Sequence, residues 1–207
     1  MQFSAAIPPD ANLERVALPF KIGPFSFALK FSIITGISGI ESVGTFTIPD
    51  NSKYIGSFAF ANTDIKEITI PKSVQHINNN AFSECDDLEI VNIQTGLKTL
   101  HSGVFSSCYK LKQINFPTTL TDVGRNCFLG CYALPEEIYL TEGLTTIHEG
   151  AFDIGSNNTH TYFLPKSLKY IHPEAFGYMS KLVVHENSYA HRYALGMTDR
   201  YEVEVIP

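Results

Sequence analysis

Apolar and polar positions alternate in short segments that recur along most of the chain. In residues 67–70, Ile68 and Ile70 stand two apart beside polar residues, and this period of two is typical of a half-buried strand. The same pattern recurs at Val91/Ile93, Ile114/Phe116, Ile138/Leu140 and Tyr162/Leu164. Proline cannot donate a hydrogen bond to a neighbouring strand, so it is expected to end a segment. It does so at Pro49, Pro71, Pro117 and Pro165. The pattern predicts a series of short strands, each buried on one side.

A second apolar series has the same spacing. It consists of Ala-Phe or a close variant, at Ala59-Phe60, Ala81-Phe82, Val104-Phe105, Cys127-Phe128, Ala151-Phe152 and Ala175-Phe176. The steps between successive Phe residues are 22, 23, 23, 24 and 24 residues, and a period in this range indicates a solenoid of stacked units. A further apolar pair opens each unit, at Val74/Ile77, Leu97/Leu100, Leu120/Val123, Leu144/Ile147 and Leu168/Ile171. Because the strand pairs share this spacing, we expect them to stack in parallel into one sheet over the Phe rings.

The shared frame is L-x-x-I-x-x-x-A-F-x-x-C-x-x-L-x-x-I-x-I-P, and it covers residues 43–188. This frame resembles the BspA-type leucine-rich repeat of bacteria and protists. The resemblance implies a mainly β fold of the α/β leucine-rich-repeat class, a right-handed solenoid. Its concave side would be a parallel sheet, and its convex side would hold short strands or 3₁₀ turns. It also implies a non-catalytic binding module, used for protein–protein interaction or cell-surface adhesion through the concave face.

The two ends depart from the frame. Three segments are expected: an N-terminal cap or degenerate repeat over 1–42, repeats of 22–24 residues over 43–188, and a C-terminal helix–strand cap over 189–207. Ser188 is a suitable helix N-cap, Tyr189 and Tyr193 share one helix face, and Gly196 follows the helix. Residues 201–205 alternate like a final strand. Residues 1–36 contain four prolines and fit no repeat, so one or two strands are expected there, and Ile37 and Ile40 are candidates to begin a degenerate turn.

Charge and hydropathy narrow the function classes. The net charge of −6 and the pI near 5.6 argue against nucleic acid as a partner, since such proteins carry a basic stripe. No apolar run approaches the ~18–20 residues that a membrane-spanning helix needs, so no membrane insertion is expected. The first twenty residues lack a basic leader, and Pro8-Pro9-Asp10 interrupts any apolar stretch. The residues leave open a cytoplasmic protein and a piece of a longer one, whereas the resemblance suggests an extracellular or cell-surface location.

The cysteines follow the repeat. Cys85, Cys108 and Cys131 are separated by 23 residues each, which predicts a stacked ladder of reduced, buried thiols. A disulfide between neighbouring turns would need Cβ directions that stacked parallel chains seldom provide. Cys127 and Cys131 form a C-x-x-x-C pair, which alone is a weak signal for a metal.

Three histidines occupy another single slot. His101, His148 and His172 each follow the core Leu or Ile of their unit directly, which places His148 and His172 about 5 Å apart on adjacent turns. Two interpretations are open: a surface metal site or pH-sensitive contact, and a solvated position that happens to carry His.

No motif of a known catalytic type occurs in the chain, neither G-x-S-x-G, nor a phosphate-binding glycine loop, nor H-E-x-x-H. The expectation is therefore that the chain is not an enzyme and uses no cofactor. An enzyme would instead require a deep pocket, which we would expect against residues 1–36.

The outward positions of the predicted concave strands are the best functional lead. One column contains Thr69, Asn92, Asn115, Tyr139 and Phe163, and beside it lie Glu67, Ile90, Gln113, Glu137 and Thr161. Tyr139 and Phe163 should be neighbours on adjacent strands. They are either an anchor for a protein contact or a cross-strand pair that only stabilises the sheet. The leading hypothesis is a binding module for an unidentified protein partner. The alternative is a structural spacer within a larger surface protein.

Overall fold

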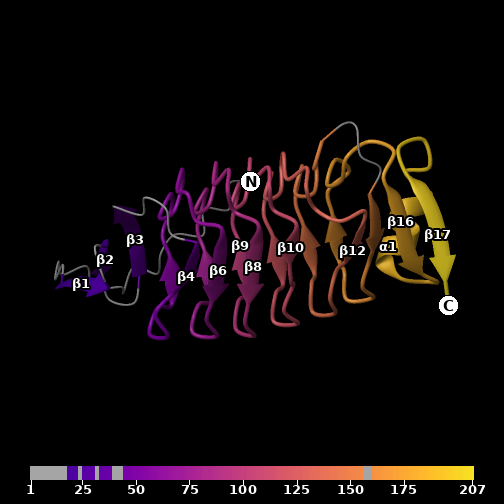
Figure 1. Ribbon diagram of the computed structural model, residues 1–207. Coiled ribbons are helices and arrows are strands. Elements are labelled where there is room, and N and C mark those ends of the chain that lie inside the picture. The colour runs from indigo at the N-terminus through magenta and orange to yellow at the C-terminus, as the bar shows by residue number, and fades with distance from the viewer. Residues whose placement is uncertain (1–17, 23–24, 31–32, 39–43, 156–159) are drawn as a thin grey trace.

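The computed structural model describes residues 18–22, 25–30, 33–38, 44–155 and 160–207. Its turns stack along one axis into a solenoid (Figure 1). A typical turn contributes a two-residue strand on one side and, on the other side, a strand that is longer in every turn except that of β10. Among these residues the only helix is α1 (Tyr189–Leu195). The mainly β solenoid expected from the repeats is therefore confirmed, and the side opposite the longer strands consists of short strands and turns.

The two-residue strands form one continuous sheet with three longer strands at its N-terminal end. Its order is β1 (Leu18–Ile22), β2 (Phe25–Lys30), β3 (Ile33–Ser38), β5 (Tyr54–Ile55), β7 (His76–Ile77), β9 (Thr99–Leu100), β11 (Asp122–Val123), β13 (Thr146–Ile147) and β15 (Tyr170–Ile171). The first three strands pair antiparallel, and β3 then pairs in parallel with β5. The expectation of one or two strands near the N-terminus was wrong, since three are present. The Gly23-Pro24 turn signal separates β1 from β2 in the sequence.

The longer strands form two sheets instead of the one expected. The N-terminal sheet contains β4 (Thr45–Thr47), β6 (Glu67–Ile70), β8 (Ile90–Ile93) and β10 (Gln113–Ile114) in that order. The C-terminal sheet contains β12 (Glu137–Tyr139), β14 (Thr161–Phe163), β16 (Lys181–His185) and β17 (Glu202–Ile206). All pairs in both sheets are parallel.

The break between β10 and β12 has a local cause in the sequence. Two residues separate Leu111 from Ile114, whereas three separate Leu134 from Ile138. The turn with the extra residue is the one at which the pairing of the longer strands stops, since β12 does not pair with β10. Pro135 lies within the longer segment and has no N–H to donate to the preceding turn. We call this break, between β10 and β12, the seam.

The Phe ladder runs through both halves without interruption. Successive rings from Phe60 to Phe176 stack with centroid separations of 4.8, 5.4, 5.6, 5.1 and 5.8 Å. All six rings are buried, and burying a side chain of this kind stabilises the fold by about 2–3 kcal/mol. Small residues precede the Phe in four turns, at Ala59, Ala81, Ala151 and Ala175, and are themselves buried. The inward positions therefore follow the repeat as the sequence predicts.

The cysteine ladder is buried, as expected, and also has a polar role. The thiols of Cys85, Cys108 and Cys131 each donate a hydrogen bond to a backbone carbonyl oxygen, those of Phe60, Phe82 and Phe105, at 3.0 Å in every case. In each pair the acceptor belongs to the preceding turn. All four cysteines are free, and burial raises the pKa of the Cys127 and Cys131 thiols. The repeated Cys therefore satisfies a buried carbonyl that a purely apolar residue would leave with fewer partners.

One turn position requires a left-handed backbone. It lies two residues before the core Phe in every turn except the last and contains Asn80, Gly103, Asn126 and Gly150, with φ of 55°, 65°, 51° and 62°. Asn and Gly adopt this region more easily than other residues. In the first turn the position is occupied by Phe58, with φ 57°, and its side chain is 61% exposed. This Phe therefore has a strained backbone without the compensation of a buried ring.

The C-terminal segment covers the last repeat. Ser188 is the N-cap of α1, and its Oγ accepts a hydrogen bond from the backbone N–H of His191 at 3.0 Å. Tyr193 and Tyr201 extend their hydroxyls to the carbonyls of His172 and Pro173, at 3.0 and 2.8 Å respectively. The predicted boundary between the repeats and the C-terminal cap, at residue 188, stays a prediction. The predicted boundary between the N-terminal segment and the repeats, at 42–43, lies outside the described residues, as do Ile40 and residues 1–17. No helix in the described part of the chain is long and apolar enough to span a membrane.

Candidate functional site

The outward side of the C-terminal sheet carries an apolar row. Register places Tyr139 beside Phe163, Phe163 beside Val183, and Val183 beside Glu204. The rings of Tyr139 and Phe163 are parallel within 9°, with centroids 4.2 Å apart. Tyr139 is 59% exposed, whereas Val183 is buried although it does not belong to the main hydrophobic core. We call Tyr139, Phe163 and Val183 the aromatic row.

A charged row runs parallel to the aromatic row. It contains Glu137, Thr161, Lys181 and Glu202 in register. The ammonium of Lys181 lies 2.7 Å from the Glu204 carboxylate and 3.5 Å from that of Glu202, and the hydrogen bond to Glu204 raises the pKa of Lys181. At the other end, the hydroxyl of Tyr139 donates to Glu137 at 2.7 Å, which raises the pKa of that tyrosine. Charged groups thus border the aromatic row on one side.

The N-terminal sheet presents a polar face. Thr69 and Asn92 lie in register, and the amide of Asn92 donates to the Glu67 carboxylate at 3.0 Å. Asn115 accepts a hydrogen bond from the Ile93 N–H at 2.7 Å and donates to the Ile93 carbonyl at 2.6 Å. These two bonds replace the backbone pairing that β10 would make if it extended past Ile114. Asn115 is therefore part of the scaffold, which its sequence position did not indicate.

The structure divides the predicted site residues between the two sheets. Thr69, Asn92, Asn115, Glu67 and Gln113 lie on or directly after strands of the N-terminal sheet, whereas Tyr139, Phe163 and Glu137 lie on the C-terminal sheet. The stacking of Tyr139 on Phe163 is as the column predicted. Val183 was missed, although its place in the same column is visible in the sequence from the apolar run after Lys181.

The seam exposes apolar groups next to the aromatic row. Ile114 and Phe116 are only partly buried, whereas the matching residues of other turns, such as Val91 and Ile138, are buried. The Phe116 ring meets Phe128 edge-on at 5.8 Å and Phe152 at 6.1 Å. The signal that could have revealed the seam was the extra residue between Leu134 and Ile138.

A second stacked pair lies away from both sheets, in the turns that follow the core Phe. Tyr109 and Tyr132 are 23 residues apart, their ring centroids are 5.7 Å apart, and their side chains are 46% and 56% exposed. The repeat spacing was the signal for this pair, which sequence reasoning missed. It provides a matched comparison for Tyr139 and Phe163.

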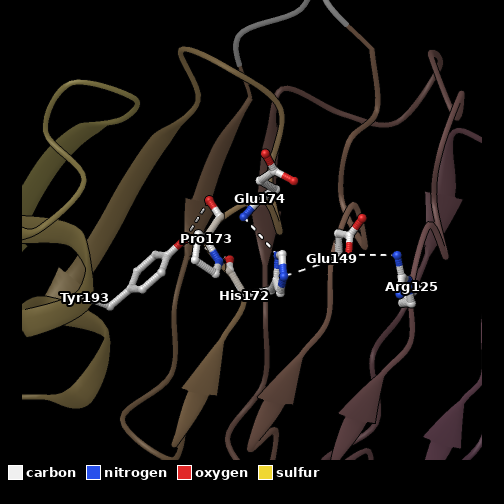
Figure 2. Close-up of polar contacts among 6 residues, drawn as sticks. All are labelled: Arg125, Glu149, His172, Pro173, Glu174 and Tyr193. Carbon is white, nitrogen blue, oxygen red and sulfur yellow. Dashed lines mark hydrogen bonds and ion pairs between the residues drawn. The ribbon is translucent and has the colours of Figure 1, made fainter. Parts of the chain in front are cut away.

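The histidine column lies on the short-strand face. The imidazole of His148 is 3.4 Å from the Asp122 carboxylate, and that of His172 is 3.8 Å from Glu149, which also pairs with Arg125 at 2.7 Å (Figure 2). The hydrogen bond to Asp122 raises the pKa of His148, whereas burial lowers the pKa of His101. Within the described ranges no group of three His, Cys, Asp or Glu could hold a metal. Within this column, His148 is thus the histidine whose protonated form a neighbouring carboxylate stabilises.

The fold and the repeats match those of known proteins. A leucine-rich repeat protein of T. pallidum is 20% identical, with a TM-score of 0.63 over 88% of this chain and 97% of its own. A leucine rich cell surface protein of Faecalibacterium prausnitzii is 23% identical, with a TM-score of 0.66 over 82% of this chain and 49% of its own. The pneumococcal vaccine antigen PcpA is 13% identical, with a TM-score of 0.69 over 88% of this chain and 48% of its own. At these identities the likeness concerns the fold alone, and this chain spans about half the length of the latter two.

No curated protein sequence matches the chain. The family described as BspA type leucine rich repeat region matches residues 37–159 and 135–189, in six copies. These segments cover the Phe ladder, the cysteine ladder and seven of the eight strands of the two longer-strand sheets. The chain belongs to the BspA-type leucine-rich repeat family.

Proposed function

We propose that the chain is a non-catalytic binding module that contacts a protein partner through the face of its longer strands, centred on the aromatic row. The observation that carries this proposal is the stacked pair of Tyr139 and Phe163, 4.2 Å apart on the outward side of the C-terminal sheet. Neither residue belongs to the hydrophobic core. Large aromatic side chains on a rigid sheet are typical anchors of protein interfaces.

The surroundings of the row support the same role. Val183 is buried and packs in register beside Phe163, which supports the exposed pair from one side, and the partly buried Ile114 and Phe116 lie across the seam from β12. Charged groups, including Glu137 and Lys181, border it, which resembles the apolar centre and polar rim of a protein interface. A structural spacer, the alternative function, would need only a solvated polar face such as that of the N-terminal sheet.

The names of two structural relatives suggest where such a module would act. One relative is named as a cell surface protein and another as a vaccine antigen. We therefore propose adhesion at a cell surface as the setting of the interaction. An apolar binding row with no catalytic motif nearby fits this setting better than it fits an enzyme.

A peptide selection tests the proposal. Binders are selected from a displayed random peptide library on the wild-type protein, and their affinities are compared with those for Tyr139→Ala/Phe163→Ala. We expect the double substitution to weaken selected binders by about a hundredfold, as expected for two interface anchors. The matched control is Tyr109→Ala/Tyr132→Ala, which removes an exposed stacked pair elsewhere and should leave binding unchanged. Equal losses in both variants, or no loss in the first, would overturn the proposal.

A further inference from the structure

The last strand of the C-terminal sheet has one side without a partner strand. β17 pairs with β16, and it ends the strand order of the sheet in the part of the chain that the structure describes. The N–H of Glu202 donates to Ser180 at 3.0 Å, and the carbonyl of Ile206 accepts from Glu186 at 2.8 Å. Even-numbered residues of β17 therefore point their backbone groups toward β16.

In a parallel ladder, alternate residues direct their N–H and C=O groups to opposite neighbours. The N–H and C=O groups of Val203 and Val205 consequently point away from β16. The Val205 side chain is 44% exposed. Proteins commonly protect such an edge with charged side chains, a proline, a bulge or a covering segment. β17 has no proline inside it and pairs with β16 in regular register over all five residues, so its protection lies in the carboxylates of Glu202 and Glu204. This edge is therefore geometrically ready to accept another strand.

The side chains along the edge specify the charge of that strand. The carboxylates of Glu202 and Glu204 have side-chain exposures of 71% and 51%, and both lie near the single ammonium of Lys181. Two negative charges and one positive charge leave a net charge of about −1 at neutral pH. A neighbouring strand with Lys or Arg beside these carboxylates would complete the pairing, because opposite charges on adjacent strands are favourable.

The edge is also continuous with the aromatic row. Register runs from Tyr139 through Phe163 and Val183 to Glu204 across four neighbouring strands. At about 4.8 Å per strand, the ring of Phe163 lies roughly 10 Å from β17. One partner can therefore contact both features at the same time.

We propose that β17 accepts an extended, basic segment of the protein partner as a fifth strand of the C-terminal sheet, while the rest of the partner covers the aromatic row. This inference rests on the proposed function and deepens it, since it assigns the partner an extended conformation and a positive charge. Strand addition of this kind derives affinity from the main chain and specificity from alternate side chains.

A second copy of the chain fits the edge less well. Two β17 strands paired edge to edge would bring Glu202 and Glu204 close to the same carboxylates of the other copy. Like charges opposite each other destabilise a strand pair. The acidic edge thus favours a basic partner segment over self-association.

The test uses a defined probe, the fluorescent peptide Lys-Thr-Lys-Val-Lys-Thr-Lys, and measures its anisotropy with the whole chain. Val205→Pro removes the outward N–H and leaves the β16 side and all charges unchanged, so we expect about tenfold weaker binding. The matched control, Val205→Ala, retains the N–H and should bind within about twofold of wild type. A peptide with Glu in place of each Lys should not bind. The Glu202→Gln/Glu204→Gln variant should bind the basic peptide several-fold more weakly.

A chemical variant of the probe makes the test independent of protein folding. The same peptide N-methylated at alternate residues cannot donate to the β17 carbonyls and should lose binding to the wild-type protein. Equal binding of the methylated and plain peptides, or equal loss in Val205→Pro and Val205→Ala, would overturn strand addition. A wild-type dimer in sedimentation that Val205→Pro converts to a monomer would also overturn it, by showing that a second copy occupies the edge. The Tyr139→Ala/Phe163→Ala variant retains the backbone edge of β17. Its binding therefore tests the proposed role of the aromatic row, whereas Val205→Pro and the methylated peptide test strand addition at β17.

Discussion

The two longer-strand sheets follow one repeat frame but present different faces. On the N-terminal sheet, the outward residues Thr69 and Asn92 are polar, and the Asn92 amide donates a hydrogen bond to the Glu67 carboxylate. On the C-terminal sheet, the equivalent positions carry Tyr139 and Phe163, stacked on each other. The inward residues of both sheets are apolar, and most of them are buried, with Ile114 and Phe116 at the seam only partly so. The repeat therefore determines what points inward and leaves the outward residues free to specialise.

The seam separates the two sheets, but the other parts of the turn continue across it. The short-strand sheet runs from β9 through β11 to β13, and the Phe ladder passes through Phe105, Phe128 and Phe152. The two halves are thus joined by one sheet and one ring stack. In a solenoid, stability is nearly a sum of units and of interfaces between neighbours, so this junction is the weakest interface of the longer-strand side.

The largest effect should come from breaking this junction. Phe128→Ala removes a buried ring that stacks on Phe105 at 5.6 Å and on Phe152 at 5.1 Å and meets Phe116 edge-on. We expect a loss of about 3–5 kcal/mol in the free energy of unfolding. Because the halves are also unpaired at the seam, we expect chemical denaturation to separate into two transitions. Tyr109→Ala, at an exposed ring one turn earlier, should cost less than about 1 kcal/mol. A single transition with a small loss would show that the halves do not depend on this ring.

The second-largest effect compares two outward residues of the N-terminal sheet, one that supports the backbone and one that is free of such a role. Asn115→Ala removes both hydrogen bonds to the backbone of Ile93, so we expect a loss of about 1–2 kcal/mol. Thr69→Ala, in the same column, should change the stability by less than about 0.5 kcal/mol. Urea denaturation of both variants measures the difference. Equal stabilities of the two variants would mean that the hydrogen bonds of Asn115 do not contribute to the stability of the fold.

The third prediction is a substitution that stabilises the protein, at the left-handed turn position that Phe58 occupies in the first turn. Phe58→Asn places at the left-handed position the residue that the next turn has at Asn80. Relief of backbone strain should stabilise the protein by about 1 kcal/mol. The reciprocal control, Asn80→Phe, should destabilise it by a similar amount. Thermal unfolding measures both, and a lower melting temperature for Phe58→Asn would instead show that the Phe58 side chain supports its turn.

The sequence predicted the inward half of the structure because burial imposes a period. The Phe ladder, the buried cysteines and the strand of each turn all repeat every 22–24 residues. The stacking of Tyr139 on Phe163 also follows, since parallel strands in register bring equal slots together.

The seam was not predicted by the same reasoning, because the extra residue between Leu134 and Ile138 marks an irregular turn but does not show which backbone hydrogen bonds are lost. Ile138 is buried despite the extra residue before it, but the strand that carries it does not pair with β10. The role of Asn115 follows from this loss of backbone pairing, so it was hidden for the same reason. The partners of outward side chains, such as Lys181 between two carboxylates, depend on rotamers that no period determines.

The smallest effect compares the two halves on the short-strand face. The folded pKa of His148 is raised by Asp122, whereas that of His101 is lowered by burial. A raised pKa contributes stability below the unfolded value of about 6.5, and this contribution is lost as the pH rises through the folded value. A lowered pKa has the opposite consequence, because the unfolded state binds the proton first and stability falls as the pH drops below about 6.5.

Substitution of each histidine by glutamine should therefore shift the stability with opposite signs at low pH. For each variant, the difference in stability from wild type is measured at pH 8 and at pH 5. Going from pH 8 to pH 5, this difference should become more destabilising for His148→Gln and more stabilising for His101→Gln. Both changes should stay below about 1 kcal/mol, because the side chains are partly exposed and solvent screens their charges. Denaturation midpoints at the two pH values measure the effect. The same sign in both variants would mean that Asp122 does not hold a proton on His148, and that the pH responses of the two halves are alike.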